Sequence, residues 1–485
     1  MKRRRESMSK VDTAWLRMER PTNLMMITSL LFFSGRVSLQ RLRETLLQRL
    51  APYERFLYKP VETPAGVVWE FDEDFDINAH VRAIGLPEPA GRKELQDLVS
   101  DLASTPLPRG RPLWQYHLVE NYEAGPVLII RIHHCYADGM ALVQVLLSMT
   151  DDRPDAAPHE EPANPQLKAY RGGVVQRILA PAQKGLDHAF GVGVRAVREA
   201  AGMVRNPGRA ADLAVEGAEM AKELLVALSL GADPKTRFKA DELSSHKRVA
   251  WCDPLPLEDV KLLARSLDVK VNDLLIAAAT GALRSYLGRH DQPPDRRLCI
   301  RATVPVNLRP LHHSKELGNH FGLVFLDLPI GEPNPLRRVE QVHDAMQHLK
   351  ESKQATVSLG LLGALGLGPA AVQAPALEFL SSKATTVLTN VPGPTKPLYL
   401  AGARIDQQMF WVPQTGNIGL GISILSYNGS VFMGIMTDAR RVPDPEEIVD
   451  RFGPEFDRLM LLRLMFPEHM VPRGRDADAL MAHWG

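Results

Sequence analysis

The chain has 485 residues, of which 45% are hydrophobic and 24% are charged, and its formal net charge is +1. This length exceeds what one hydrophobic core usually serves, so two domains are expected, and the composition excludes an intrinsically disordered chain. The near-neutral charge argues against a nucleic-acid-binding protein, because neutralising phosphates requires a basic surface. We therefore expect a globular protein without a nucleic-acid partner.

The chain contains three cysteines, Cys135, Cys252 and Cys299, without any CxxC spacing. An odd, scattered set predicts neither a disulfide framework nor a zinc site, and it fits a reducing cytoplasm. The basic start and the apolar run at 24–33 resemble an export signal only faintly, because charged residues lie between them. No run reaches the roughly 20 uninterrupted apolar residues that a membrane span needs.

Residues 1–150 mix strand and helix patterns and are predicted to form the first domain. The apolar run at 127–132 predicts a buried strand, and residues 140–149 predict the helix that follows it. Residues 151–166 are rich in proline, alanine and acids, a composition that does not pack. The first α/β domain is therefore expected to end there.

Residues 151–245 are predicted to form a linker with basic helices. Between residues 171 and 209 there are seven basic side chains and two acidic ones. A basic amphipathic helix suits an anionic lipid surface, where basic groups meet headgroups and apolar groups enter the interface. A solvated helix that bridges two domains is the alternative interpretation.

Residues 246–485 are predicted to form a second α/β domain. The pattern indicates a helix at 272–287, strands at 298–306, 322–329 and 385–391, and a terminal helix at 446–462. Asn428-Gly429 lies between two strand-like runs, and this dipeptide is typical of a two-residue hairpin turn. No period of 20 to 50 residues repeats, which argues against solenoids and propellers.

The segment VLIIRIHHCYADGM, residues 127–140, leads from a strand through two histidines into a helix. Successive side chains of a strand point to opposite faces, so His133 and His134 cannot both face one site. Asp138 is placed to cap the next helix, and Gly139 lets the backbone approach closely. A neutral imidazole at His134 could take a hydroxyl proton during attack on a thioester, without a separate nucleophile.

Other chemistries fit this motif less well. The chain has no G-x-S-x-G elbow and no G-x-x-x-x-G-K-[ST] loop. Strand alternation turns Cys135 away from His134, which disfavours a cysteine–histidine pair. A metal site from His133, His134 and Asp138 lacks H-E-x-x-H spacing and further ligands. Two buried, hydrogen-bonded core histidines are the remaining structural alternative.

HHCYADG resembles the HHxxxDG signature of coenzyme A-dependent acyltransferases and of peptide-synthetase condensation domains. Further segments match in order, so that nearly the whole chain resembles bacterial wax ester synthase/diacylglycerol acyltransferases. These segments are VDTAWLRMERPTNLMM (11–26), PLW (112–114), VNDLLIAAATGALR (271–284), RATVPVNLRP (301–310), LGNHFG (317–322) and NVPGPTKPLYLAGA (390–403). One departure is Met25-Met26, where the family usually has Met-His, which leaves the alcohol preference open.

The resemblance implies two chloramphenicol-acetyltransferase-like domains with mixed sheets flanked by helices, related by a pseudo-twofold axis, with an active-site tunnel between them. It implies that His134 is the general base, that His133 and Asp138 support it, and that Asn272 lies near the site from the second domain. An asparagine there also suits a helix N-cap. Asp273 is expected beside it, in a substrate-binding or a structural role.

Substrate-lining residues are predicted in two further segments. Pro112, Leu113 and Trp114 could line the substrate path, although an apolar triplet beside a strand is equally often core. Gly360 and Gly363 recur on one predicted helical face and could leave room for an acyl chain, whereas close helix packing would explain them equally well.

The resemblance thus predicts an O-acyltransferase that makes wax esters or triacylglycerols from acyl-CoA and a fatty alcohol or diacylglycerol. Acyl-CoA is expected as a substrate, with no cofactor and no metal, and the protein is expected in the cytoplasm, peripherally bound to the inner membrane or to lipid inclusions. A condensation-type or polyketide-tailoring enzyme with a carrier-bound donor and a non-catalytic lipid-binding protein are the alternatives. Oligomeric state and chain-length preference stay open.

Overall fold

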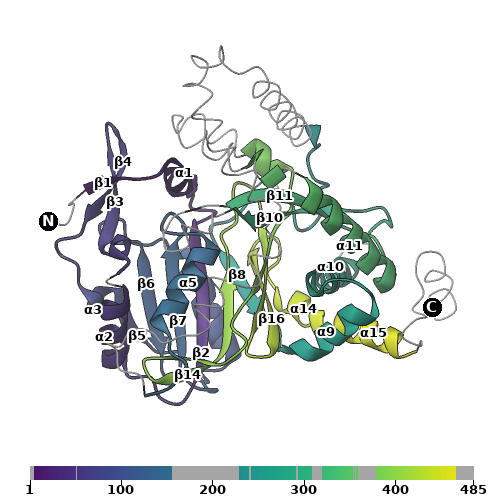
Figure 1. Cartoon of the computed structure of the whole chain (residues 1–485). Helices are drawn as coiled ribbons and strands as arrows, with labels where there is room; N and C mark the ends of the chain where they lie inside the picture. Colours follow the sequence, from purple (N-terminus) through teal and green to yellow (C-terminus); the bar gives the residue numbers. More distant parts are fainter. Residues whose placement is uncertain are drawn as a thin grey trace, which may run out of the picture.

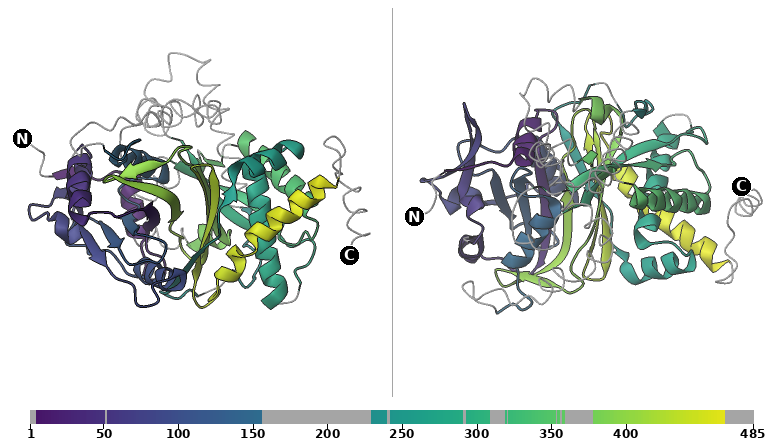
Figure 2. Two further views of the ribbon diagram at one scale, coloured as in Figure 1. Left: turned by 90° about the horizontal axis from the view of Figure 1, so that it is seen from below. Right: turned by 45° about the horizontal axis from the view of Figure 1, so that its top comes forward.

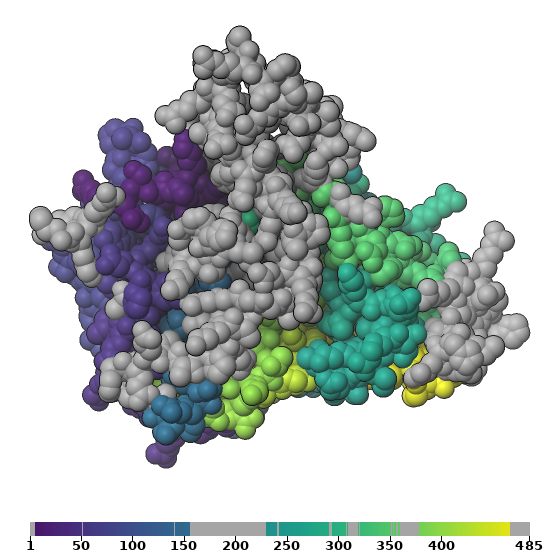
Figure 3. Space-filling view, in the orientation of Figure 1, coloured from purple at the N-terminus to yellow at the C-terminus, as the bar shows by residue number. Residues whose placement is uncertain are grey.

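The computed structural model describes residues 5–50, 52–155, 229–239, 242–290, 293–308, 319, 321–352, 354–355, 357–358 and 378–465. Two large β-sheets lie beside each other, and each is flanked by helices (Figure 1). The earlier part of the chain builds most of one half, and the later part builds the other. Figure 3 shows the same division on the surface, purple and blue against teal to yellow.

The first sheet has six strands in the order β13-β14-β2-β7-β6-β5. The β5–β6 pair is parallel and the other pairs are antiparallel, so the sheet is mixed. A three-stranded sheet, β1-β4-β3, adjoins it in this half. The strands are β1 (Arg5–Ser7), β2 (Met26–Ser34), β3 (Tyr58–Thr63), β4 (Gly66–Phe71), β5 (Val81–Ile84), β6 (Trp114–Val119), β7 (Val127–His133), β13 (Leu398–Leu400) and β14 (Ala403–Trp411).

Helices of this half connect and cover the strands. They are α1 (Lys10–Met18), α2 (Leu39–Leu50), the short 3-10 helix η1 (Glu54–Leu57), α3 (Ile77–His80), α4 (Arg92–Ser104) and α5 (Gly139–Met149). The central strand β7 is buried at every position. A strand covered on both faces is expected to be continuously apolar, and this explains its run of branched aliphatic residues.

The second sheet has the order β11-β10-β12-β15-β16-β8, and β9 pairs with β16. β12 is parallel to β10 and β15, and the other pairs are antiparallel. Helices cover its outer face (Figure 2). The elements are β8 (Lys247–Trp251), β9 (Leu255–Pro256), α9 (Leu257–Ser266), α10 (Val271–His290), β10 (Ile300–Asn307), β11 (Phe321–Leu328), α11 (Pro335–Glu351), β12 (Thr386–Pro392), β15 (Leu420–Tyr427), β16 (Ser430–Asp438), α14 (Glu446–Val449) and α15 (Phe452–Leu464).

Two strands from the later part of the chain belong to the first sheet. β14 pairs antiparallel with β2, from Arg404 opposite Ser34 to Trp411 opposite Thr28, and β13 pairs with β14. Figure 1 shows β14 next to β2 in the first half. The chain therefore crosses from the second half into the first and returns at β15, within the range 246–485 that the sequence assigns to one domain.

The main predicted elements have the expected type. The strand predicted at 127–132 is β7, the helices predicted at 140–149 and 272–287 are α5 and α10, and the three predicted strands are β10, β11 and β12. The Asn428-Gly429 hairpin is confirmed, because the two residues join β15 to β16 with positive φ angles of 47° and 80°. The mixed sheets flanked by helices confirm the predicted fold class.

The prediction of one terminal helix at 446–462 is wrong. The structure has two helices there, α14 and α15, separated by Asp450 and Arg451. Pro454 lies in the first turn of α15, and a proline has no N–H with which to bond the carbonyl four residues earlier. A continuous helix across this point would therefore leave the Asp450 carbonyl without its helical partner.

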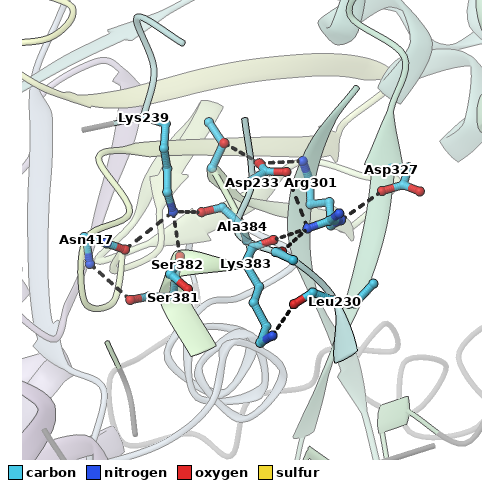
Figure 4. A network of polar contacts seen from close by, with 12 residues as sticks. Leu230, Asp233, Lys239, Arg301, Asp327, Ser381, Ser382, Lys383, Ala384 and Asn417 are labelled. Carbon is cyan, nitrogen blue, oxygen red and sulfur yellow. Dashed lines mark hydrogen bonds and ion pairs between the residues drawn. The ribbon is translucent and has the colours of Figure 1, made fainter. Parts of the chain in front are cut away.

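Residues 229–239, which lead into the second half, are fixed by a polar network (Figure 4). The ammonium group of Lys239 donates to the backbone oxygens of Ser381 and Ala384, and Arg301 donates its backbone N–H to Asp233 at 2.9 Å. Lys239 is buried, so these acceptors replace the water that its charge has lost. The network fastens this segment to the turn before β12.

Two sequence predictions fall outside the described residues. They are the basic helices at 171–209 and the glycines Gly360 and Gly363. Among the helices that the structure describes, none is long and apolar enough to span a lipid bilayer.

Candidate active site

His134 follows the last residue of β7 at the junction between the two halves. Its backbone N–H donates to the carbonyl of Met25 at 2.7 Å, which extends the β2–β7 pairing by one more bond. The side chains of His133 and His134 have different surroundings. The His134 ring meets aromatic side chains, whereas the His133 ring meets a carboxylate.

Aromatic side chains surround the His134 imidazole. Its ring stacks on Trp15 of α1, with centroids 4.3 Å apart, and Phe321 of β11 lies at 5.5 Å. His134 is only 5% exposed. Burial lowers the pKa of His134 to about 4, although the nearby Asp138 carboxylate acts in the opposite direction. The ring is therefore neutral at pH 7, and its Nδ1 is buried with no hydrogen-bond partner in the described part of the chain.

His133 lies beside an acidic side chain. Its Nε2 is 3.0 Å from a Glu19 oxygen, and its Nδ1 accepts from the Cys135 N–H at 3.1 Å. Arg109 donates to the other Glu19 oxygen at 2.7 Å. Burial alone would raise the pKa of Glu19, but the His133 ring and Arg109 lower it to about 2. Glu19 therefore stays ionised beside His133.

Asp138 and Gly139 form the start of α5. Asp138 is the N-cap residue, and its Oδ1 accepts from the backbone N–H of Ala141 at 2.9 Å. This is the capping role that the sequence indicates for a carboxylate in this position. A Cβ placed on Gly139 would meet no atom within 4 Å, so packing does not require glycine there.

A hydrogen-bonded link joins the histidine loop to the second half. The side-chain nitrogen of Asn319 donates to Asp12 Oδ1 and to the backbone oxygen of His134, both at 2.8 Å. The backbone N–H of Asn319 donates to the same Asp12 oxygen at 3.1 Å. Asp12 is 1% exposed and Asn319 is 3% exposed. Helix α1, the histidine loop and Asn319, which lies two residues before β11, thus meet at one buried point.

Asn272 and Asp273 lie in the first turn of α10. The Asn272 side-chain oxygen accepts from Asn390 at 2.5 Å, which joins two of the segments that carry the resemblance. Asp273 is buried and lies 2.7 Å from the Nδ1 of His343 on α11. No described contact joins either residue to His134, so a role for Asn272 in the reaction stays a prediction.

The PLW segment, residues 112–114, is hydrogen-bonded to the histidine loop. The Leu113 carbonyl accepts from the His133 N–H at 3.0 Å, and the Tyr136 hydroxyl accepts from the Leu113 N–H at 3.0 Å. Trp114 is fully buried and donates to the Phe56 carbonyl at 2.8 Å. Pro112 is buried as well. These contacts are those of core residues, and a role in lining the substrate path stays a prediction.

The other chemistries considered for this region find little support nearby. Burial raises the pKa of the Cys135 thiol well above its usual value, so the thiolate is disfavoured. Among the described residues, one group of side chains could hold a metal ion: His290, Asp444 and Glu447, at the end of α10. That group includes none of the residues of the histidine motif.

Sequence reasoning missed four residues of this site, namely Trp15, Glu19, Asn319 and Phe321. Each lies in a segment that carries the family resemblance, 11–26 or 317–322, but the motifs alone indicated no role for them. Their function depends on contacts with the histidine loop, which are visible only in the folded chain.

The two halves of mixed sheets and the buried histidine at their junction define a protein of the HHxxxDG acyltransferase class. Residues 8–275 match the family model of the wax ester synthase/diacylglycerol acyltransferase catalytic domain, and residues 317–460 match that of the WS/DGAT C-terminal domain. The chain belongs to the wax ester synthase/diacylglycerol acyltransferase family and is an acyltransferase.

Relatives and solved structures agree with this assignment. A protein from Mycobacterium tuberculosis (strain CDC 1551 / Oshkosh), provisionally named a diacylglycerol O-acyltransferase, is 30% identical over 85% of this chain and 86% of its own length. The wax ester synthase/diacylglycerol acyltransferase from Marinobacter aquaeolei VT8 superposes with a TM-score of 0.65 at 21% identity, covering 94% of this chain and 99% of that chain. The first condensation domain of the CDA synthetase has the same fold, with a TM-score of 0.57 at 15% identity over 93% and 96%.

Proposed function

We propose that this acyltransferase moves a fatty acyl group from acyl-CoA to the hydroxyl of a long-chain alcohol or of diacylglycerol, with His134 as general base. The observation that carries the proposal is the neutral, buried His134 imidazole at the junction of the two halves. A general base must be unprotonated to accept a proton, and burial keeps this ring so at pH 7.

The proposed reaction takes place in one step within a ternary complex. The alcohol oxygen attacks the thioester carbonyl as His134 takes the hydroxyl proton, the C–S bond breaks, and the proton passes to the departing CoA sulfur. The products are an ester and free CoA. No covalent enzyme intermediate is required, which agrees with the poor reactivity of the buried Cys135.

The surroundings of His134 suit apolar substrates. Trp15 and Phe321 present aromatic carbon to the ring, and such surfaces favour an acyl chain over water. Exclusion of water also protects the thioester from hydrolysis.

The test is replacement of the base by a side chain of similar size. His134→Gln should lower ester formation on the order of 100- to 10,000-fold, the usual contribution of a general base. His133→Gln is the matched control, because it removes the neighbouring ring and leaves the base in place; it should cost less activity than His134→Gln. Near-normal turnover by a folded His134→Gln variant would exclude His134 as the base.

Diacylglycerol is proposed as an acceptor of the acyl group because the names of the relatives refer to it. Incubation with palmitoyl-CoA and either hexadecanol or diacylglycerol, followed by mass analysis, should yield a wax ester, a triacylglycerol or both. Transfer only from a carrier-protein thioester, with none from acyl-CoA, would instead favour the condensation-type alternative. Lipid binding without any transfer would favour a non-catalytic protein.

We also propose that the reaction needs no metal or other cofactor, because the thioester is already activated and the base is a side chain. Activity should survive dialysis against EDTA, and a loss that Zn²⁺ or Mg²⁺ restores would contradict this.

Access to the lipid substrates is proposed to depend on peripheral binding to the inner membrane or to lipid inclusions through the basic residues at 171–209. Replacing Arg195, Arg198 and Arg205 by glutamine should weaken binding to anionic liposomes and leave neutral liposomes unaffected. Unchanged binding to anionic liposomes would remove these residues from the proposal.

A further inference from the structure

The orientation of the Asn319 side chain is fixed by its two hydrogen bonds. Its amide nitrogen donates to a carboxylate oxygen of Asp12 and to the backbone oxygen of His134. Asp12 Oδ1 also accepts from the Asn319 backbone N–H. The Asn319 side-chain atom that lies beside these two acceptor oxygens must therefore be the nitrogen, and the other side-chain atom is the oxygen.

Two polar atoms at this point have no partner. They are the side-chain oxygen of Asn319 and the Nδ1 of His134, both buried and without a hydrogen bond to any described residue. One is an acceptor, and the other becomes a donor in one of the two imidazole tautomers. The two residues are already in contact, because the Asn319 side-chain nitrogen donates to the His134 backbone oxygen. Buried polar groups are normally hydrogen-bonded, so an unpaired acceptor and an unpaired ring nitrogen on adjoining residues point to each other.

We propose that Asn319 is the positioning residue of His134: its side-chain oxygen accepts the Nδ1 proton and so leaves the Nε2 lone pair for the substrate hydroxyl. This inference rests on the proposed role of His134 as the base and adds the group that orients it. A histidine base elsewhere in enzymes is commonly oriented by a third residue, and an asparagine oxygen serves that purpose in some cysteine proteases.

The reaction itself gives a reason for such an acceptor. When His134 takes the hydroxyl proton, the ring becomes positively charged in a site lined by Trp15 and Phe321, which do not solvate a charge well. Burial lowers the pKa of His134 to about 4, which makes a weak base, whereas the adjoining Asn319 side chain acts to raise this pKa. An oxygen at Nδ1 stabilises the imidazolium as it forms and thereby strengthens the base.

The other charged groups around the ring act less directly. Asp138, on the same loop, raises the pKa of His134, and His133 lowers it. Asp12, on α1, is bound to Asn319, and burial raises its pKa against the effects of Arg55 and Asn319. Glu19 faces His133. Asn319 is thus the neutral polar side chain that connects the base to the second half of the molecule.

The first experiment reads the His134 tautomer without using the reaction. Protein labelled with ¹⁵N-histidine should show His134 as the Nδ1–H tautomer in correlation spectra, assigned by comparison with His134→Gln. Asn319→Leu, a substitution of similar size, should abolish the single tautomer. Asn334→Ala is the matched control: it removes the buried N-cap asparagine of α11 and should leave the His134 signal unchanged.

The second experiment measures the pH profile of kcat/KM. Asn319→Leu should lower kcat on the order of 100-fold with little change in KM for acyl-CoA, because the base is misplaced while substrate binding is kept. The double variant Asp12→Asn with Asn319→Asp exchanges the carboxylate and the amide and keeps an acceptor at Nδ1. It should recover part of kcat and move the acid limb of the profile to higher pH, since a negative charge raises the pKa of the ring.

These results separate the two proposals. An Nε2–H tautomer in the wild-type protein, or a His134 signal that Asn319→Leu leaves unchanged, would overturn the role of Asn319 whatever the activity. An active His134→Gln variant would remove the base, although the tautomer experiment would still decide whether Asn319 binds Nδ1. Should Asn319→Leu not fold, the double variant decides: an acid limb unmoved from wild type would contradict the proposal.

Discussion

Two adjacent histidines acquire different properties because successive residues at the end of β7 face different surroundings. His133 meets Glu19, whose pKa is lowered to about 2 by the ring and Arg109 against the effect of burial. His134 meets Trp15 and Phe321, and its loss of water outweighs the effect of the nearby Asp138 carboxylate on its pKa. One ring is anchored by a permanent negative charge, and the other is kept neutral. This difference agrees with the proposal that His134 is the base and His133 its supporting neighbour.

The burial of His134 predicts a pH dependence of stability. Its pKa is about 4 in the folded protein and 6.5 in an unfolded chain. As the pH falls from 6.5 towards 4, the unfolded state binds a proton that the folded state does not, so the free energy of unfolding decreases. The full effect is roughly 3 kcal/mol, since each pKa unit corresponds to about 1.4 kcal/mol. His134→Gln should make this loss shallower in urea unfolding curves recorded from pH 7.5 to 4.5.

The control for this prediction is His348→Gln, which removes an exposed histidine of α11. His117 should contribute in the same direction as His134, because burial and the nearby Arg131 and Arg82 lower its pKa to about 4. An equal slope in wild type and His134→Gln would show that the ring is not desolvated in the folded state.

At the scale of elements, α10 shows how one helix combines a crowded and an open position. The ion pair between Arg338 of α11 and Glu455 of α15 passes directly over Gly281 of α10. A Cβ at Gly281 would overlap both side chains, whereas a Cβ at Gly288, about two turns further along the same helix, would meet no described atom within 4 Å. Gly281 is therefore required by the packing of three helices.

This contrast predicts opposite effects of the same substitution. Gly281→Ala should lower the free energy of unfolding by about 1 to 3 kcal/mol, because the buried ion pair must shift. Gly288→Ala should raise it by up to about 1 kcal/mol, since alanine has the higher helix propensity and the site is exposed. Urea denaturation of the two variants measures both. A destabilised Gly288→Ala together with a neutral Gly281→Ala would contradict this account of the helix interface.

At the scale of the whole molecule, the crossing strands make the two halves depend on each other. β14 is one of the inner strands of the first sheet, although the chain on both sides of β13 and β14 belongs to the second. The Tyr427 hydroxyl of β15 accepts from the Leu398 N–H and donates to the Ile405 carbonyl, both at 2.8 Å. Lys247 of β8 also donates to Asn23, just before β2, at 2.7 Å. The first sheet is therefore incomplete without strands from the later part of the chain.

We therefore expect the molecule to unfold in one transition. Urea unfolding followed by far-UV circular dichroism and by tryptophan fluorescence should give coincident curves.

Tyr427→Phe should lower the free energy of unfolding by about 1 to 3 kcal/mol, because it leaves a buried N–H and a buried carbonyl unpaired, and both probes should shift together. Tyr122→Phe, a half-buried tyrosine of the first half, is the control. Two separable transitions would show that the halves are independent.

The sequence by itself determined the features that depend on neighbouring residues. The strand and helix around the histidines, the Asp138 cap and the Asn428-Gly429 turn all follow from local periodicity and backbone preference. The break between α14 and α15 was missed because the apolar pattern continues across it and masks the effect of Pro454.

Only the tertiary structure decided how the site is assembled. Asn319 lies 185 residues from His134 and 307 from Asp12, and β14 reaches β2 from the other end of the chain. Nothing in local periodicity specifies which distant segments meet, because that choice depends on the packing of the whole chain. The burial that makes His134 neutral, and the amide that adjoins it, therefore appear only when both halves are in place.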